Sequence, residues 1–300
     1  MKKTLLIITS LVFITSVVFP QSKMDIDNLI DMDGLLYKPN DDKPYTGKVF
    51  DLYDNAKKKF DGKYRNGLKN GKWTWWSEGG KMGSSGTYKD GIKNGKWTRW
   101  YENEQKKEEA TFKEGKEDGL LTDWYENGRK KREVTYKEGK EDGLLTDWYK
   151  NEQKKMEGTY NNGKQVDKWT WWYENGRKRK EGTFKEGKAD GLLTVWHKNE
   201  QKKMEGTYNN GKQVDKWTYW YENGQTEQEG TFKDGKQVDK WTAWYRTGEN
   251  KSGGTYRDGK KDGPWTKWYK TGEKYYEDIY KDRKLIESKK WDRDGNLIED

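Results

Sequence analysis

The polar and hydrophobic positions of this chain repeat every 24 residues, in ten copies that run from Gly47 to Ile286. The consensus of the copies is Gly-Lys-Trp-Thr-x-Trp-Tyr-Glu-Asn-Gly, then a basic stretch, then Glu-Gly-Thr-Tyr-Lys-x-Gly-Lys. A repeat of this length predicts an array in which each unit buries its apolar side chains only against its neighbours.

Each repeat contains two segments that are typical of strands. Lys-Trp-Thr-x-Trp-Tyr is rich in aromatic and β-branched residues, and Glu-Gly-Thr-Phe-Lys at residues 181–185 forms the second segment. An Asn-Gly pair such as Asn127-Gly128 follows the first segment, and a turn such as Lys89-Asp90-Gly91 follows the second. We therefore predict an all-β fold, an elongated antiparallel array of β-hairpins with the form of a ribbon or solenoid.

One tryptophan per repeat anchors the pattern. It recurs as Trp76, Trp100, Trp124, Trp148, Trp172, Trp196, Trp220, Trp244 and Trp268. The second strand usually has a glycine two residues before its aromatic residue, as in Gly62 before Tyr64. Because residues two apart share a face of a strand, we expect the anchor tryptophan to pack over this glycine.

The array is flanked by three segments of different composition. Residues 1–22 combine Lys2 and Lys3 with an apolar run, which is typical of a secretory signal peptide; an uncleaved anchor is the alternative. We expect an N-terminal cap at residues 23–46, the repeats at 47–286, and a degenerate C-terminal cap at 287–300. The chain is therefore expected to be exported to the periplasm, the outer surface or the medium. Without cysteine it cannot be a lipoprotein.

Composition changes this picture in two ways. Charged residues make up 38% of the chain and hydrophobic residues only 30%, which alone borders on disorder, yet 18 Trp and 20 Tyr keep the register of the repeat. The core is therefore expected to be a thin aromatic stripe. The net charge of +9 is modest, so acidic partners, envelope polymers or anionic lipid surfaces are compatible with it.

These repeats resemble the MORN-repeat variant found in bacterial proteins that are named YwqK-family antitoxins. The opening from Gly34-Leu35-Leu36-Tyr37 to Thr46-Gly47 is similar to the usual start of that family. The resemblance implies a ribbon of β-hairpins that mediates protein–protein contact, and the antitoxin name implies neutralisation of a toxin by direct binding. A weaker similarity connects the chain to cell-wall-binding repeats, whose aromatic side chains cage a cationic ligand.

The residue types that catalysis needs are scarce. The single histidine, His197, occupies a position that is tyrosine in most copies, and no cysteine is present. Asp123 and Asp147 occupy one position in adjacent repeats, but the same position holds Arg99, Val195 and other residues elsewhere. We therefore expect no enzymatic activity, no metal, no cofactor and no specific nucleic-acid partner.

The position between the two Trp of the first strand varies while everything around it is constant. It holds Trp75, Arg99, Asp123, Asp147, Trp171, Val195, Tyr219, Ala243 and Lys267. Such a position is expected to be exposed, and its aromatic members Trp75, Trp171 and Tyr219 are candidate partner contacts. Drift at a tolerant position is the alternative.

The basic stretches after the Asn-Gly turns are further candidates. They contain Arg129, Lys130, Arg177 and Arg179, which could line one edge and attract anions, although a solvated edge explains them as well. The favoured function is binding of a protein or cell-envelope partner along an extended β surface. The alternatives are an antitoxin or immunity protein, and a wall-binding protein with aromatic cages. Membrane contact is expected only through the signal peptide or weakly at the surface.

Overall fold

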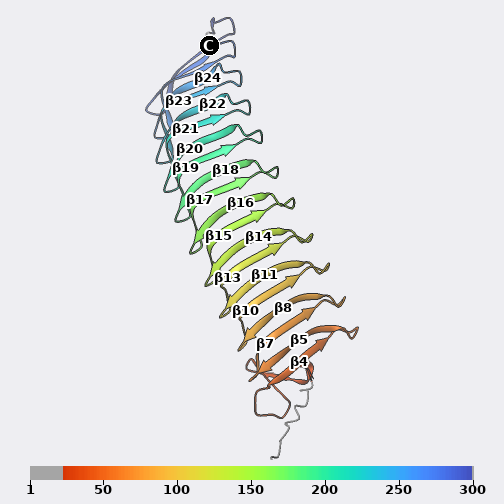
Figure 1. Cartoon of the computed structure of the whole chain (residues 1–300). Coiled ribbons are helices and arrows are strands. Elements are labelled where there is room, and N and C mark those ends of the chain that lie inside the picture. Colours follow the sequence, from red (N-terminus) through yellow and green to blue (C-terminus); the bar gives the residue numbers. More distant parts are fainter. Residues whose placement is uncertain (1–22, 299–300) are drawn as a thin grey trace, which may run out of the picture.

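The structure is a computed structural model of the chain, and it describes residues 23–298. The predicted signal peptide at residues 1–22 lies outside the described residues. The array forms one long sheet of 26 strands, in which successive strands pair antiparallel from β4 to β28, and β1 adds in parallel to β4. Figure 1 shows the resulting elongated ribbon of hairpins, which turns about its long axis from one end to the other. The predicted all-β hairpin array is confirmed.

Every repeat contributes one first strand and one second strand. The first strands are β4 (Gly47–Leu52), β7 (Gly71–Trp76), β10 (Gly95–Trp100), β13 (Gly119–Trp124), β15 (Lys140–Trp148), β17 (Lys164–Trp172), β19 (Lys188–Trp196), β21 (Lys212–Trp220), β23 (Lys236–Trp244), β25 (Lys260–Trp268) and β27 (Lys284–Trp291). The second strands are β5 (Lys58–Arg65), β8 (Met82–Lys89), β11 (Lys106–Lys113), β14 (Lys130–Lys137), β16 (Lys154–Asn161), β18 (Lys178–Lys185), β20 (Lys202–Asn209), β22 (Thr226–Lys233), β24 (Asn250–Arg257) and β26 (Lys274–Lys281). The short strands β6 (Leu68–Lys69), β9 (Ile92–Lys93) and β12 (Lys116–Glu117) precede β7, β10 and β13.

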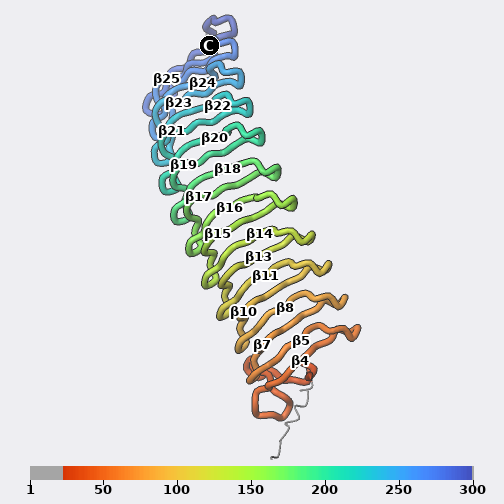
Figure 2. The backbone as a smooth tube through the Cα atoms, in the orientation of Figure 1, coloured from red at the N-terminus to blue at the C-terminus, as the bar shows by residue number. Residues whose placement is uncertain are grey.

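Two kinds of turn alternate along the ribbon, one on each long edge (Figure 2). At the tight-turn edge, two residues such as Asp90 and Gly91 both have positive φ, as a type I′ hairpin requires. At the wide-turn edge, the Gly128 N–H donates to the Tyr125 carbonyl, and only Gly128 has positive φ. The Asn-Gly pair therefore ends a wider turn, and the type I′ turn is formed by the second turn sequence.

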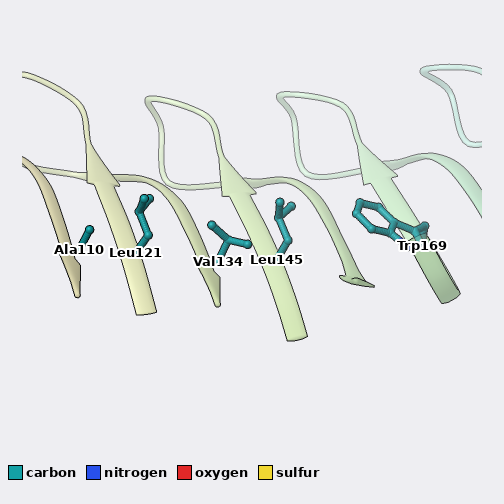
Figure 3. Packing of buried hydrophobic residues seen from close by; sticks show 5 residues of the cluster. All are labelled: Ala110, Leu121, Val134, Leu145 and Trp169. Atoms are coloured by element: carbon teal, nitrogen blue, oxygen red, sulfur yellow. The ribbon is translucent and has the colours of Figure 1, made fainter. Parts of the chain in front are cut away.

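The core is a single row of side chains on one face of the sheet. Its members from the first strands are Val49, Trp73, Trp97, Leu121, Leu145, Trp169, Leu193, Trp217, Trp241 and Trp265, all at most 9% exposed. Figure 3 shows part of this row, in which Ala110, Leu121, Val134, Leu145 and Trp169 follow one another along the sheet, with β16 between the strands of Leu145 and Trp169. We name this side of the sheet the aromatic face.

The glycines of the second strands accommodate these core tryptophans. A Cβ built on Gly62 would lie 2.2 Å from the Trp73 ring, and one on Gly86 would lie 2.1 Å from the Trp97 ring. The prediction that the anchor tryptophan, such as Trp76, covers the glycine is therefore wrong. Trp73 covers it because Trp73 and Gly62 share a face, whereas Trp76 lies three residues further along the strand and on the opposite face.

Both ends of the array differ from its middle. At the N-terminus, β1 (Met24–Asp25), the 3-10 helix η1 (Ile26–Asn28), and the hairpin of β2 (Ile30–Met32) and β3 (Leu35–Tyr37) precede the first repeat. Tyr45 is buried there in a cluster with Val49, Tyr64 and Trp73. At the C-terminus, the short β28 (Leu297–Ile298) pairs only with the end of β27, and Leu285 and Ile286 remain exposed.

Candidate functional site

The aromatic face combines the core row with two further rows of side chains. One row is the variable position two residues after each core residue, and the other is the aromatic residue of each second strand. At the N-terminal end, Trp75 lies between Trp73 and Trp97, with ring centroids 5.7 and 5.6 Å apart and interplanar angles of 26° and 29°. Tyr88 meets all three rings edge-on. This offset and edge-to-face packing is the arrangement that aromatic rings prefer.

The other aromatic residues at the variable position have fewer ring partners. Trp171 stacks on Trp169 at 5.8 Å and meets Phe184 at 6.0 Å, and Tyr219 lies 6.2 Å from Trp217. These side chains are half-buried, so the prediction that the variable position is exposed is wrong for the aromatic members. The physical reason is that residues two apart on a strand share a face, which places the variable position beside the core row.

Lysines of the chain itself lie over several of these rings. The Lys69 ammonium is 4.8 Å from the centroid of Trp73, and Lys93 is 4.4 Å from that of Trp97. Lys261 lies 4.6 Å from Trp265, and Lys180 lies 4.7 Å from Trp171. Burial, together with the neighbouring Arg179, lowers the pKa of Lys180. At these four repeats the cation–π position above the ring is therefore filled from within.

The middle of the aromatic face is charged. Asp123 and Asp147 lie on opposite sides of Arg132 in the strand register, and they line a hollow of about 140 Å³. Burial raises the pKa of both carboxyl groups, and the charge of Glu108 raises that of Asp123 further. Arg132 also pairs with Glu141, and one carboxylate oxygen of Asp147 is buried without a hydrogen-bond partner. Two aromatic regions are thus separated by a charged one.

The anchor tryptophans lie on the other face, which we name the threonine face after its buried Thr74, Thr98, Thr122, Thr146, Thr170 and Thr194. Trp76 and its equivalents are half-buried, and lysines lie over several of them, as Lys58 does at 5.3 Å from Trp76. Their backbone carbonyls accept a hydrogen bond from the tyrosine of the preceding repeat, for example from Tyr53 at 2.8 Å. This bond recurs from Tyr101 to Tyr269 and links each repeat to the next.

His197 takes the position of this tyrosine. Its Nε2 lies 2.9 Å from the Trp220 carbonyl oxygen, where the hydroxyl of Tyr173 lies 2.8 Å from that of Trp196. As a donor in this bond, the imidazole reproduces the tyrosine link. The structure therefore places the only histidine in a packing role at a repeat junction.

The basic stretches lie at or near the wide-turn edge. Arg129 is 3.6 Å from Glu152, and Arg177 is 3.7 Å from Glu200; each also donates to a carbonyl of the next turn. Lys130 pairs with Glu133, whereas Arg179 is exposed. The eleven five-residue segments of this edge, from 53–57 to 292–296, contain nine Lys and Arg against thirteen Asp and Glu. The edge carries a net charge of −4, which does not favour anions.

The opposite edge carries the positive charge of the molecule. Its ten four-residue turns, from 65–68 to 281–284, contain seventeen Lys and Arg against seven Asp and Glu, a net charge of +10. The position after the turn glycine or its equivalent is an exposed lysine in eight consecutive repeats: Lys116, Lys140, Lys164, Lys188, Lys212, Lys236, Lys260 and Lys284. This lysine row was not among the features predicted from the sequence, although a charge count by position within the repeat would have found it.

Two further features bear on chemistry. Residues 23–298 contain no group of three or more His, Asp or Glu side chains placed to hold a metal ion. In the same part of the chain, no helix has the length and apolar character needed to cross a membrane.

Comparison with known proteins supports the repeat type. The family described as the MORN repeat variant matches residues 93–114, 117–138, 168–186 and 216–234. These four segments are therefore similar to MORN-variant repeats. No curated protein matches the sequence.

The structure is also similar to parts of much larger crystallised chains. One, "Crystal Structure of TcdB2-TccC3-Cdc42", shares 11% identity at a TM-score of 0.20 and covers 88% of this chain and 14% of that chain. Another, "Crystal Structure of TcdB2-TccC3", shares 9% at a TM-score of 0.18 and covers 83% and 17%. This chain thus spans about a seventh of the length of the first. At such TM-scores the likeness says nothing about the function of this chain.

Proposed function

We propose that this chain is an exported, non-catalytic scaffold that binds a protein partner along its aromatic face. The observation that supports the proposal is a row of half-buried aromatic rings on a sheet of a single layer. In residues 23–298 no second layer of strands or helices covers Trp75, Trp171 and Tyr219; only the flexible side chains of Lys69 and Lys180 lie over two of them, at 5.8 Å from the centroid of Trp75 and 4.7 Å from that of Trp171. Large rings with one open side are frequent anchors of protein interfaces, because they bury much area at a small cost in conformational entropy.

The aromatic-cage alternative is less well supported. A cage binds an external cation only where no internal cation fills it, and Lys69, Lys93, Lys180 and Lys261 already lie over their rings. The antitoxin alternative, by the resemblance to the YwqK family, differs from our proposal in the partner and its compartment. The same experiment can therefore separate the two.

The test is site-specific photo-crosslinking in the native host. A photoreactive phenylalanine derivative replaces Trp75 or Trp171 in the full chain, and the matched control places it at Lys240, which is exposed on the threonine face. We expect one defined protein adduct from positions 75 and 171 in the envelope fraction, and none from 240. Equal adducts from all three positions would contradict binding by the aromatic face. A single small toxic protein captured in the cytosol would instead support the antitoxin alternative.

A second candidate function is supported by the lysine row at the tight-turn edge. Here we propose that the edge holds a linear anionic polysaccharide of the cell envelope. Lysine stems pack over the glycine of the next turn: a Cβ built on Gly139 would lie 3.7 Å from the Cβ of Lys116, and one on Gly187 would lie 3.8 Å from that of Lys164. Two strands per repeat set the lysines roughly 9.6 Å apart, so eight of them extend over about 70 Å.

The partner's chemistry follows from the shape and composition of this edge. A twisted edge can be followed by a flexible polymer, whereas a planar bilayer would touch only a few lysines at once. The tight turns contain no aromatic residue on which nucleic-acid bases could stack. Twelve of the seventeen basic residues of these turns have no acidic partner within 4 Å in the described part of the chain.

This candidate is tested by binding of heparin fragments of increasing length to the full chain at several salt concentrations. The variant combines Lys164→Gln, Lys188→Gln, Lys212→Gln and Lys236→Gln, and the matched control combines Lys150→Gln, Lys198→Gln, Arg246→Gln and Lys270→Gln at the wide-turn edge. We expect the first variant alone to lose binding, and its slope of log K against log salt to fall by about three. Equal losses in both variants, or tighter binding of anionic vesicles or single-stranded DNA, would overturn it.

A further inference from the structure

A hollow of about 130 Å³ lies on the aromatic face between two core tryptophans of the C-terminal repeats. Trp241 and Trp265 line it together with Tyr256, and Ala243 occupies the variable position there. Gln228, Gln237 and Ser252 supply polar groups around it. The hollow is thus a narrow space with aromatic walls and a polar rim.

The same arrangement of two core tryptophans and one second-strand tyrosine, which we name a frame, occurs at the other end of the ribbon. Tyr88 lies 6.1 Å from Trp73 and 5.1 Å from Trp97, and Tyr256 lies 6.2 Å from Trp241 and 4.9 Å from Trp265. Corresponding centroid distances in the two frames therefore agree to within 0.2 Å.

The two frames differ in what occupies the space between the tryptophans. Trp75 fills it in the N-terminal frame, stacked at 5.7 and 5.6 Å between its neighbours. The strand register is the same in both, because Trp75 is opposite Ser84 and Ala243 is opposite Ser252. The hollow therefore has the place of an indole ring that the sequence does not supply.

We propose that the hollow over Ala243 binds one flat aromatic side chain, a tryptophan or tyrosine, of a protein partner. A ring in this position stacks between two indoles as Trp75 does, and the amides of Gln228 and Gln237 can bond its N–H or hydroxyl group. An aliphatic side chain fills a space between two indole rings less well than a flat ring does. The inference rests on the proposed function, because it names the group by which a partner would engage the aromatic face.

The first experiment is an NMR titration of the full chain with alanine methyl groups labelled with carbon-13. The probe is N-acetyl-tryptophanamide, and N-acetyl-leucinamide is the comparison ligand. A ring bound over Ala243 shifts the methyl signal of that residue upfield in a saturable manner, and we expect the leucine ligand to give at most a fifth of this shift. Equal shifts from both ligands would overturn the inference, since they would indicate an apolar hollow without selectivity for aromatic rings.

The second experiment fills the hollow. Ala243→Trp supplies the missing indole and is expected to raise Tm and to abolish saturable binding of the probe, monitored at the Trp265 indole N–H. The matched control Lys150→Trp adds an indole at the wide-turn edge and should leave binding unchanged. A lower Tm in Ala243→Trp, or undiminished binding by this variant, would show that an indole does not fit.

The two proposals can fail separately. If crosslinking at Trp75 and Trp171 captures a partner but the probe does not bind, the hollow is not a recognition site and the scaffold proposal stands. If the probe binds but no partner is captured, the hollow accepts a ring while the proposed function fails.

Discussion

Two regions of the ribbon fill the same core row in different ways. In the C-terminal repeats, tryptophan covers glycine, as Trp169 covers Gly158 and Trp217 covers Gly206. In residues 110–145, leucine takes the place of the tryptophan, and the residue opposite it is larger than glycine, in the pairs Ala110 with Leu121 and Val134 with Leu145. Because Gly182 faces Leu193 without a clash, the glycine is required where a tryptophan covers it, and a larger residue fits where leucine takes the place of the tryptophan.

The largest expected effect comes from combining one residue of a glycine–tryptophan pair with one residue of a valine–leucine pair. Trp169→Leu leaves a cavity beside Gly158, and Gly158→Val forces a side chain into the Trp169 ring, 2.1 Å from where its Cβ would lie. We expect each change to lower the free energy of unfolding by about 2–4 kcal/mol. The double variant recreates the Val134–Leu145 pair and should recover about 1–3 kcal/mol as coupling energy. Urea unfolding of the four proteins in a double-mutant cycle measures it; additive losses would contradict a shared volume.

The next effect compares the two faces at one repeat. Trp171 packs against Trp169 and Phe184, whereas Trp172 on the threonine face contributes mainly its backbone carbonyl to the Tyr149 bond. Trp171→Ala should therefore cost about 1–2 kcal/mol more stability than Trp172→Ala, since two aromatic pairs are lost. Thermal unfolding of both variants decides this, and a greater loss in Trp172→Ala would restore the role that the sequence suggested for the anchor row.

A smaller effect concerns the tyrosine links between repeats. Tyr173→Phe removes the bond to the Trp196 carbonyl and should cost about 0.5–1.5 kcal/mol. Ser77 occupies the tyrosine position in the second repeat and its hydroxyl lies 3.5 Å from Glu102 instead. Ser77→Tyr should accordingly add stability of the same order. Hydrogen exchange of the strands on either side of each junction is the measurement, and Tyr37→Phe in the N-terminal segment is the control.

The pair of Gly182 and Leu193 joins the glycine of one kind of pair to the leucine of the other, and it predicts a substitution that stabilises the protein. Here a glycine faces a leucine, and a Cβ on Gly182 would lie at an ordinary 3.4 Å from the Leu193 side chain. Gly182→Ala should raise the free energy of unfolding by about 0.4–1 kcal/mol, because it restricts the unfolded chain without a clash. The matched Gly158→Ala should lower it. If both changes act in the same direction, the clash with tryptophan is not what retains the glycine.

The charged middle of the aromatic face gives a pH prediction. Burial raises the pKa of Asp147, so the folded state binds a proton more tightly than the unfolded state. The contribution of Asp147 to the free energy of unfolding therefore becomes more favourable as the pH falls from neutrality through the folded-state pKa. It levels off below the ordinary pKa of about 3.9. Asp147→Asn should remove this dependence and stabilise the protein at pH 7. Urea unfolding at pH 7 and at pH 4 tests it, with the exposed Asp54→Asn as control. An unchanged difference in stability between the two pH values in Asp147→Asn would contradict the assignment.

The repeat length, the two strands of each repeat and the position of both turns can be predicted from the sequence alone, because they depend on local propensity and on a period that recurs ten times. It also indicated a packing role for His197, which occupies a tyrosine position. These features require no knowledge of which strands are neighbours beyond the order of the chain.

The choice of tryptophan that lies over the glycine, and the half-buried state of the aromatic residues at the variable position, follow from the paired strands and not from the sequence pattern. Both depend on the register between strands, and a shift of a single residue exchanges the two faces of a strand. The charged middle of the aromatic face and the hollow over Ala243 likewise exist only between repeats, where residues of adjacent repeats become neighbours. The strands and turns of a single repeat can be predicted from the sequence, whereas the surfaces of the ribbon depend on how the repeats pack against one another.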